Sequence, residues 1–222
     1  VKDKGEDNPV TDADLAANLM LGQAQSFANA GEYEQARAIV TRIIEHFPVE
    51  VHKAAQRQHA DILVEEGAYP EAVRVYRELM EGAESQIERV TLEASIAETL
   101  LQGGRYGEAA LGFESLRDNN AADTEAHALG VLGLARVAES RGDVVLSRRL
   151  YESIADTTSD PGLLALAFEG LAQSWLDAGR DDQAMRAYQK FLSEVPPEHE
   201  SALSARGEMA GILVRRGELE AA

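Results

Sequence analysis

The sequence contains no cysteine, and only 5 % of its 222 residues are aromatic. Without cysteine there is no disulfide, no thiolate metal site and no cysteine nucleophile. No apolar run approaches the roughly 18 residues that a membrane-spanning helix requires, so we expect no membrane insertion by this segment. Basic residues are also scarce, since 21 Lys and Arg stand against 39 Asp and Glu, a net charge of −18. Nucleic acid is therefore not an expected partner, because phosphate binding needs clustered basic side chains.

Apolar residues make up 45 % of the chain, which is enough for a packed core. The acidic residues are spread along the whole chain rather than gathered in a tail. An evenly acidic surface keeps a protein soluble, and it also steers basic partners toward a docking surface. Both interpretations stay open at this stage.

Six segments of the sequence align on a glycine, at spacings of 36 to 38 residues. These loop glycines are Gly31, Gly67, Gly104, Gly142, Gly179 and Gly217. Seven residues before each glycine stands an alanine: Ala24, Ala60, Ala97, Ala135, Ala172 and Ala210. Five residues after it stands a small residue: Ala36, Ala72, Ala109, Ser147, Ala184 and Ala222. Large apolar residues follow nine and twelve residues after the glycine, as in Tyr76 and Leu79. Ala17 falls outside these aligned positions, so we expect it outside the packed core.

This spacing predicts a helical hairpin in each repeat. Offsets of three and four residues place the apolar side chains on one helix face, and the glycine ends the first helix by adopting a left-handed backbone. One hairpin cannot bury its own apolar face, so neighbouring hairpins must stack. First helices are expected near residues 12–30, 50–66, 84–102, 123–141, 160–178 and 198–216. Second helices are expected near 32–47, 69–81, 105–119, 143–157 and 180–195, with a short piece after Gly217.

The two ends of the chain do not follow the pattern completely. Residues 1–11 lack periodicity and are expected to form a linker or disordered end before a single repeat array over residues 12–222. The sixth repeat stops at Ala222, so we expect the chain to be a fragment of a longer repeat protein. Leu213 and Val214 would then lack a covering helix, which makes self-association through this open C-terminal repeat a further expectation.

The aligned residues resemble the tetratricopeptide repeat family, whose pattern is W-x₂-L-G-x₂-Y followed by A-x₃-F, A and P. The fifth repeat matches it with Phe168, Leu171, Ala172, Trp175, Gly179, Ala184, Tyr188, Phe191 and Pro196. The period is longer than the family's 34 residues, and it is similar to that of bacterial outer-membrane assembly lipoproteins and Tol-Pal coordinator proteins. The resemblance implies an all-α, right-handed superhelical solenoid of five complete repeats plus a truncated sixth. A bacterial periplasmic or envelope location is favoured over the cytoplasm.

The resemblance also implies a function. Family members are scaffolds or adaptors that bind a protein or peptide segment in a concave groove lined by first helices. The matching positions here are polar: Asn18, Gln25, Asn29, Arg57, Asp61, Glu65, Glu98, Gln102, Arg136, Gln173 and Asp177. Some members grip a terminal carboxylate with a cluster of basic and amide side chains, but only Arg57 could supply a cation at the matching positions here, so this clamp is not expected. Two alternatives remain: these side chains are merely solvated, or the chain is the sensing or regulatory arm of an enzyme or signalling protein whose active domain lies elsewhere.

Recurrent catalytic motifs are missing from the sequence. It has no phosphate-binding loop, no H-E-x-x-H, no EF-hand loop and no G-x-S-x-G elbow. We therefore predict no catalytic activity, no cofactor and no metal site. His59 and Trp175 occupy apolar positions of the repeat, so we expect a partly buried structural histidine and a core tryptophan. Asp160 is expected to cap a helix that starts at Pro161.

Overall fold

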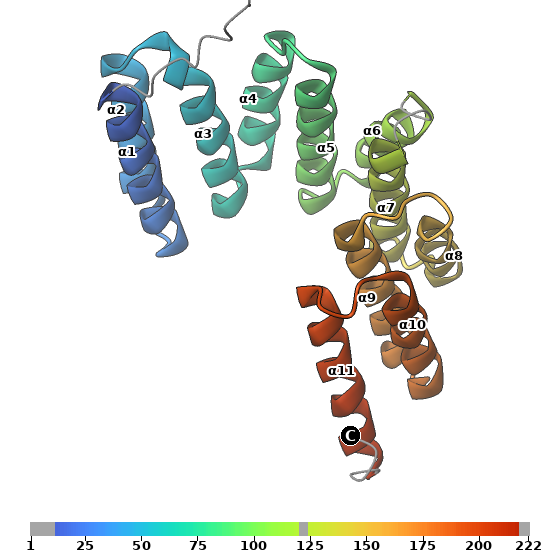
Figure 1. The fold of residues 1–222 in the computed structure, drawn as a ribbon. Coiled ribbons are helices and arrows are strands. Elements are labelled where there is room, and N and C mark those ends of the chain that lie inside the picture. The colour runs from blue at the N-terminus through green and yellow to red at the C-terminus, as the bar shows by residue number, and fades with distance from the viewer. Residues whose placement is uncertain (1–11, 120–123, 218–222) are drawn as a thin grey trace, which may run out of the picture. The chain divides into compact units, whose positions relative to one another are not determined.

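A computed structural model describes residues 12–119 and 124–217, and all of the regular structure in these ranges is helical (Figure 1). The α-helices are α1 (Asp12–Asn29), α2 (Tyr33–His46), α3 (His52–Glu66), α4 (Tyr69–Glu81), α5 (Gln86–Gln102), α6 (Tyr106–Asn119), α7 (Thr124–Ser140), α8 (Val144–Ile154), α9 (Pro161–Asp177), α10 (Asp181–Glu194) and α11 (Glu200–Arg216). One 3₁₀ turn, η1 (Val49–Val51), precedes α3. The all-α prediction is confirmed, and the order matches five helix pairs followed by one further first helix. The predicted linker at 1–11 and the short piece after Gly217 lie outside the described residues.

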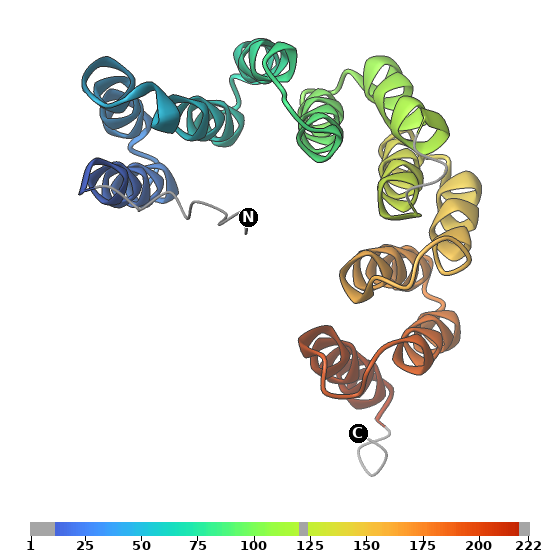
Figure 2. The same cartoon turned by 45° about the horizontal axis from the view of Figure 1, so that its top comes forward.

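The chain divides into two compact units. The N-terminal unit, residues 1–103, contains α1 to α5, and the C-terminal unit, residues 104–222, contains α6 to α11. Within each unit, helices that follow one another in the chain pack side by side, and first helices also contact first helices, as α1 does α3 and α7 does α9. Figure 2 shows the N-terminal helices α1 to α5 nearly end-on. Each unit thus stacks hairpins as the repeat pattern predicts.

The six loop glycines all have a left-handed backbone, with φ between 66° and 83°. No other residue of the described ranges has a positive φ. Any other side chain would be strained in this conformation. The aligned glycines therefore end the first helices for the backbone reason that the sequence suggested.

The aligned apolar positions form the core. Of the alanines seven residues before the loop glycine, five are completely buried and Ala210 is partly buried. The small and large residues of the second helices are buried as well, for example Ala36, Tyr76 and Leu79. Ala17 is also completely buried, so the expectation that it lies outside the core was wrong. It stands seven residues, about two turns, before Ala24, and therefore shares the buried face of α1.

Among the glycines inside first helices of the C-terminal unit, two at an equivalent position contact aromatic rings, which the sequence analysis missed. A Cβ atom added to Gly133 of α7 would lie 2.1 Å from the ring of Phe113 in α6. A Cβ atom added to Gly170 of α9 would lie 2.6 Å from the ring of Tyr151 in α8. Both glycines stand nine residues before a loop glycine, at equivalent positions of successive repeats. At each of them a large ring of the preceding second helix rests on the backbone of a first helix.

Helix ends follow local hydrogen bonding. The Asp160 carboxylate accepts from the Leu163 amide at 2.8 Å, which confirms the predicted cap before Pro161. Helix α8 ends at Ile154, three residues earlier than expected. Here the amide and the hydroxyl of Thr157 both donate to the Ile154 carbonyl, at 2.9 and 2.8 Å, and close the helix with a turn.

Candidate functional site

The predicted binding positions divide between the two units. Eight of the eleven lie on α1, α3 and α5 of the N-terminal unit, and three lie on α7 and α9 of the C-terminal unit. All of them are exposed or half-buried, so none belongs to the apolar core. Each unit therefore presents its own polar surface on its first helices, called here the first-helix strip.

In the N-terminal unit, hydrogen bonds join the strip residues of α1 to those of α3. The Gln25 amide donates to Asn29 and to Glu65, both at 2.9 Å. Gln58 donates to the Gln25 side-chain oxygen at 3.1 Å and to the Leu21 carbonyl at 3.0 Å. The structure thus brings three predicted residues together, and it adds Gln58. The signal for Gln58 was its place one residue after Arg57 on the same helix.

Asp61 is engaged in a different contact. It accepts a hydrogen bond from the hydroxyl of Tyr76 in α4, and Tyr76 itself is buried. Burial, followed by the hydrogen bond to Asp61, raises the pKa of the Tyr76 hydroxyl far above its ordinary value. Asp61 therefore helps to fix α4 against α3, besides presenting charge on the strip.

Two further pairs of strip residues are hydrogen-bonded within single helices. Gln102 donates to Glu98 at 3.2 Å along α5. Gln173 donates to Asp177 at 2.7 Å along α9. Arg136 of α7 and Asn18 of α1 are exposed. Side-chain pairs of this kind, one turn apart on one helix face, add little to stability.

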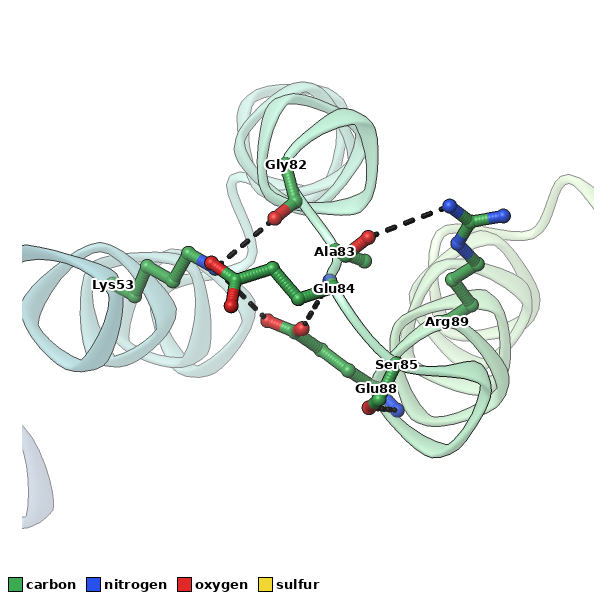
Figure 3. Close-up of polar contacts among 7 residues, drawn as sticks. All are labelled: Lys53, Gly82, Ala83, Glu84, Ser85, Glu88 and Arg89. Carbon is green, nitrogen blue, oxygen red and sulfur yellow. Dashed lines mark hydrogen bonds and ion pairs between the residues drawn. The ribbon is translucent and has the colours of Figure 1, made fainter. Parts of the chain in front are cut away.

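A further polar cluster ties α3 to the loop between α4 and α5 (Figure 3). Lys53 Nζ donates to the Gly82 carbonyl at 3.0 Å and to Glu84 Oε1 at 2.8 Å. The Glu88 carboxylate accepts from the Glu84 amide at 2.8 Å, and Ser85 Oγ accepts from the Glu88 amide at 3.1 Å. The hydrogen bond from Lys53 lowers the pKa of Glu84. This cluster starts α5 and fixes its loop, and the sequence signal for it was the Ser85-x-x-Glu88 capping pattern.

His59 and Trp175 are both partly buried within the fold. His59 is half-buried, and burial, helped by Arg37 and Arg74, lowers its pKa. Trp175 is partly buried against the C-terminal core, and the Arg148 guanidinium lies 3.6 Å from its ring centroid. The expectation for His59 is confirmed, whereas Trp175 lies at the edge of the core rather than inside it.

Across residues 12–119 and 124–217, no three His, Asp or Glu side chains are grouped closely enough to hold a metal ion. Within the same ranges, no helix combines the length and the apolar character needed to cross a membrane.

Solved structures with similar folds include the following three proteins. PilF of Pseudomonas aeruginosa is 15 % identical, with a TM-score of 0.55 over 95 % of this chain and 90 % of that chain. BtubC from P. vanneervenii is 15 % identical, with a TM-score of 0.59 over 92 % and 86 %. PilW, a widely conserved type IV pilus biogenesis factor, is 17 % identical, with a TM-score of 0.54 over 92 % and 89 %. At these identities the likeness is one of fold.

Sequence comparison is more specific. No curated protein sequence matches the chain significantly. A model of the tetratricopeptide repeat matches residues 21–86 and 95–162, and a second model of the same repeat matches residues 166–197. Stacked repeats of this kind present extended surfaces to other proteins and act in general as interaction scaffolds. The chain belongs to the tetratricopeptide repeat family.

Proposed function

We propose that this chain is a non-catalytic scaffold or adaptor that binds a segment of a partner protein along its first-helix strips. One observation carries the proposal. Equivalent positions of the first helices hold polar or charged side chains, such as Gln25, Asp61, Glu98, Arg136 and Gln173, while the neighbouring aligned positions are apolar and buried. Polar side chains that lie outside the apolar core at repeated positions can contact a partner segment.

The charge of the chain indicates what kind of partner it favours. The net charge is −18, and the strip of the N-terminal unit carries Asp61, Glu65 and Glu98 against Arg57. Acidic surfaces accelerate encounter with basic partners, and salt screens this effect. A basic partner segment is therefore part of the proposal, and its association rate should fall as the salt concentration rises.

An envelope location is the finer part of the proposal. The repeat period of 36 to 38 residues supports it, because the long-period bacterial type resembles envelope assembly proteins. The likeness to PilW, a type IV pilus biogenesis factor, is one of fold and identifies no partner. Fractionation of cells that express the tagged natural protein tests the location directly.

The binding test begins with capture of partners and their identification by mass spectrometry. The triple variant Arg57→Glu, Glu98→Arg and Arg136→Glu should then weaken binding of the captured partner. The expected loss in binding free energy is at least about 1.4 kcal/mol, which is about tenfold in Kd. A matched triple variant on exposed second-helix positions, Arg77→Glu, Glu114→Arg and Arg149→Glu, makes the same charge changes and should leave Kd unchanged. The proposal fails if the second-helix variant loses the partner and the strip variant keeps it.

A further inference from the structure

A small pocket in the C-terminal unit lies between the first helices α9 and α11, with α10 behind it. Its volume is about 90 Å³. Phe168 and Phe191, whose ring centroids lie 5.9 Å apart, form its apolar wall. Glu169 of α9, Tyr188 of α10 and Glu208 of α11 contribute its polar groups. The pocket thus combines a narrow apolar interior with two carboxylates and one phenol.

Tyr188 differs from the tyrosines at the equivalent position of two other repeats. The Tyr76 hydroxyl donates to Asp61, and the Tyr151 hydroxyl donates to Glu139 at 3.0 Å. Tyr188 is only 5 % exposed, yet among residues 12–119 and 124–217 its hydroxyl has no hydrogen-bond partner. Within the described ranges, Ser147 Oγ is the buried side-chain oxygen that lacks a partner. The Tyr188 oxygen therefore reaches solvent in the pocket that Tyr188 lines, where a polar group of a ligand can replace water.

The electrostatics of the pocket favour a cation. Burial, and then the negative charges of Glu208 and Glu169, raise the pKa of Tyr188 to about 12, and the positive charge of Arg215 opposes this only in part. Both glutamates are exposed at the protein surface, so an incoming group can reach them. An ammonium ion has three donors, which match two carboxylates and one phenol oxygen.

We infer that this pocket binds a lysine side chain of the partner segment, with the ammonium group between Glu169, Glu208 and the Tyr188 hydroxyl. This rests on the proposed function, because it names one contact that the partner makes on the first helices. The volume equals that of about three water molecules, which accommodates an ammonium group and the adjoining part of its stem. Lysine presents a compact charge on an apolar stem, whereas arginine presents a wide planar fork, so the pocket favours lysine. The apolar stem lies against the two phenylalanine rings.

The test uses a lysine peptide of defined sequence, acetyl-Ala-Ala-Lys-Ala-Ala-amide, and the protein with ¹³C-labelled tyrosine rings. Addition of the peptide should shift the ring signals of Tyr188 in a saturable way, and the Tyr188→Phe variant assigns those signals. The matched peptide with norleucine in place of lysine keeps the stem and lacks the charge. It should bind about tenfold more weakly or not at all, because hydrogen bonds to charged groups are lost.

Variants locate the site. The double variant Glu169→Gln and Glu208→Gln keeps the side-chain shapes and should lose about tenfold in affinity for the lysine peptide. The control is Glu152→Gln with Glu194→Gln, on exposed positions of α8 and α10, and it should keep the affinity. Thermal unfolding confirms that both proteins are folded.

Three outcomes overturn the inference: no saturable shift of Tyr188, equal binding of the norleucine peptide, or unchanged affinity in the double glutamine variant. In each case the pocket is not a site for a lysine ammonium group. The strip variants at Arg57, Glu98 and Arg136 do not change the pocket lining. If those variants fail to weaken the partner while the lysine peptide still binds at Tyr188, only the proposed strip is wrong.

Discussion

The two units use different contacts to pack neighbouring helices together. Nine residues before the loop glycine, the N-terminal unit has Gln58 in α3, which hydrogen-bonds to Leu21 and Gln25 of α1. At the same aligned position, the C-terminal unit has Gly133 and Gly170, which receive aromatic rings of the preceding second helices. One hairpin repeat can therefore be stacked through a polar side chain or through direct ring-to-backbone contact. The polar side chain leaves hydrogen-bonding groups at the surface, whereas the ring-to-backbone contact buries apolar area.

This difference predicts the largest effect for Gly133→Ala. The added Cβ would overlap the ring of Phe113, which is only 2 % exposed and has little room to move. Overpacking of a core costs about 1–3 kcal/mol, and the better helix propensity of alanine returns up to about 1 kcal/mol. We expect a net loss of about 1–2 kcal/mol in the free energy of unfolding of the C-terminal unit, measured by urea denaturation.

The matched control for that variant is Gly22→Ala in α1. Gly22 has the same aligned position in the first repeat, and a Cβ atom there would meet nothing within 4 Å. Helix propensity should therefore act alone and stabilise the N-terminal unit by about 0.5–1 kcal/mol. Effects of the same sign in both variants would show that the glycine contact does not distinguish the units.

The hydrogen bonds of Gln58 in the N-terminal unit predict a smaller effect on the free energy of unfolding. Gln58→Ala removes the hydrogen bonds to the Leu21 carbonyl and to Gln25. Each hydrogen bond contributes about 0.5–1.5 kcal/mol, and the groups left behind are half-buried and partly regain water, so we expect a loss of about 1 kcal/mol. Gln23→Ala, at an exposed position of the same unit, is the control and should change the free energy of unfolding by less than about 0.5 kcal/mol. If both variants unfold at the same urea concentration, Gln58 does not stabilise the stack.

The smallest expected effect is a dependence on pH confined to the N-terminal unit. Burial lowers the pKa of His59 below its ordinary value near 6.5. The unfolded chain then binds a proton at a higher pH than the folded chain does. Stability should be constant above that ordinary value and should decrease as the pH falls below it. Urea midpoints measured across this range, for the native chain and for His59→Gln, test this, and an identical pH profile of the two would exclude His59 as the cause.

Some of the site could be predicted from the sequence, and some could not. The aligned positions placed Gln25 and Asn29 on one face of α1 and Glu65 on one face of α3. The structure joins these residues by hydrogen bonds. The engagement of Asp61 by Tyr76 was not predictable, because it depends on how α4 lies against α3. The pocket around Tyr188 was missed for the same reason, since its lining comes from three helices that are separate in the sequence. Periodicity reports which face a residue is on, but not which side chain of another helix it meets.

The sequence by itself determined which segments form helices and where the first helices end. Local causes decide this: a left-handed glycine closes each first helix, an aspartate caps α9, and apolar offsets of three and four residues set the buried face. Only the tertiary structure decided which contacts hold neighbouring hairpins together and which polar groups remain at the surface. Ala17 shows the limit, because a position outside the aligned pattern is completely buried. Burial depends on the distance between two helix backbones, and that distance is set jointly by side chains far apart in the chain.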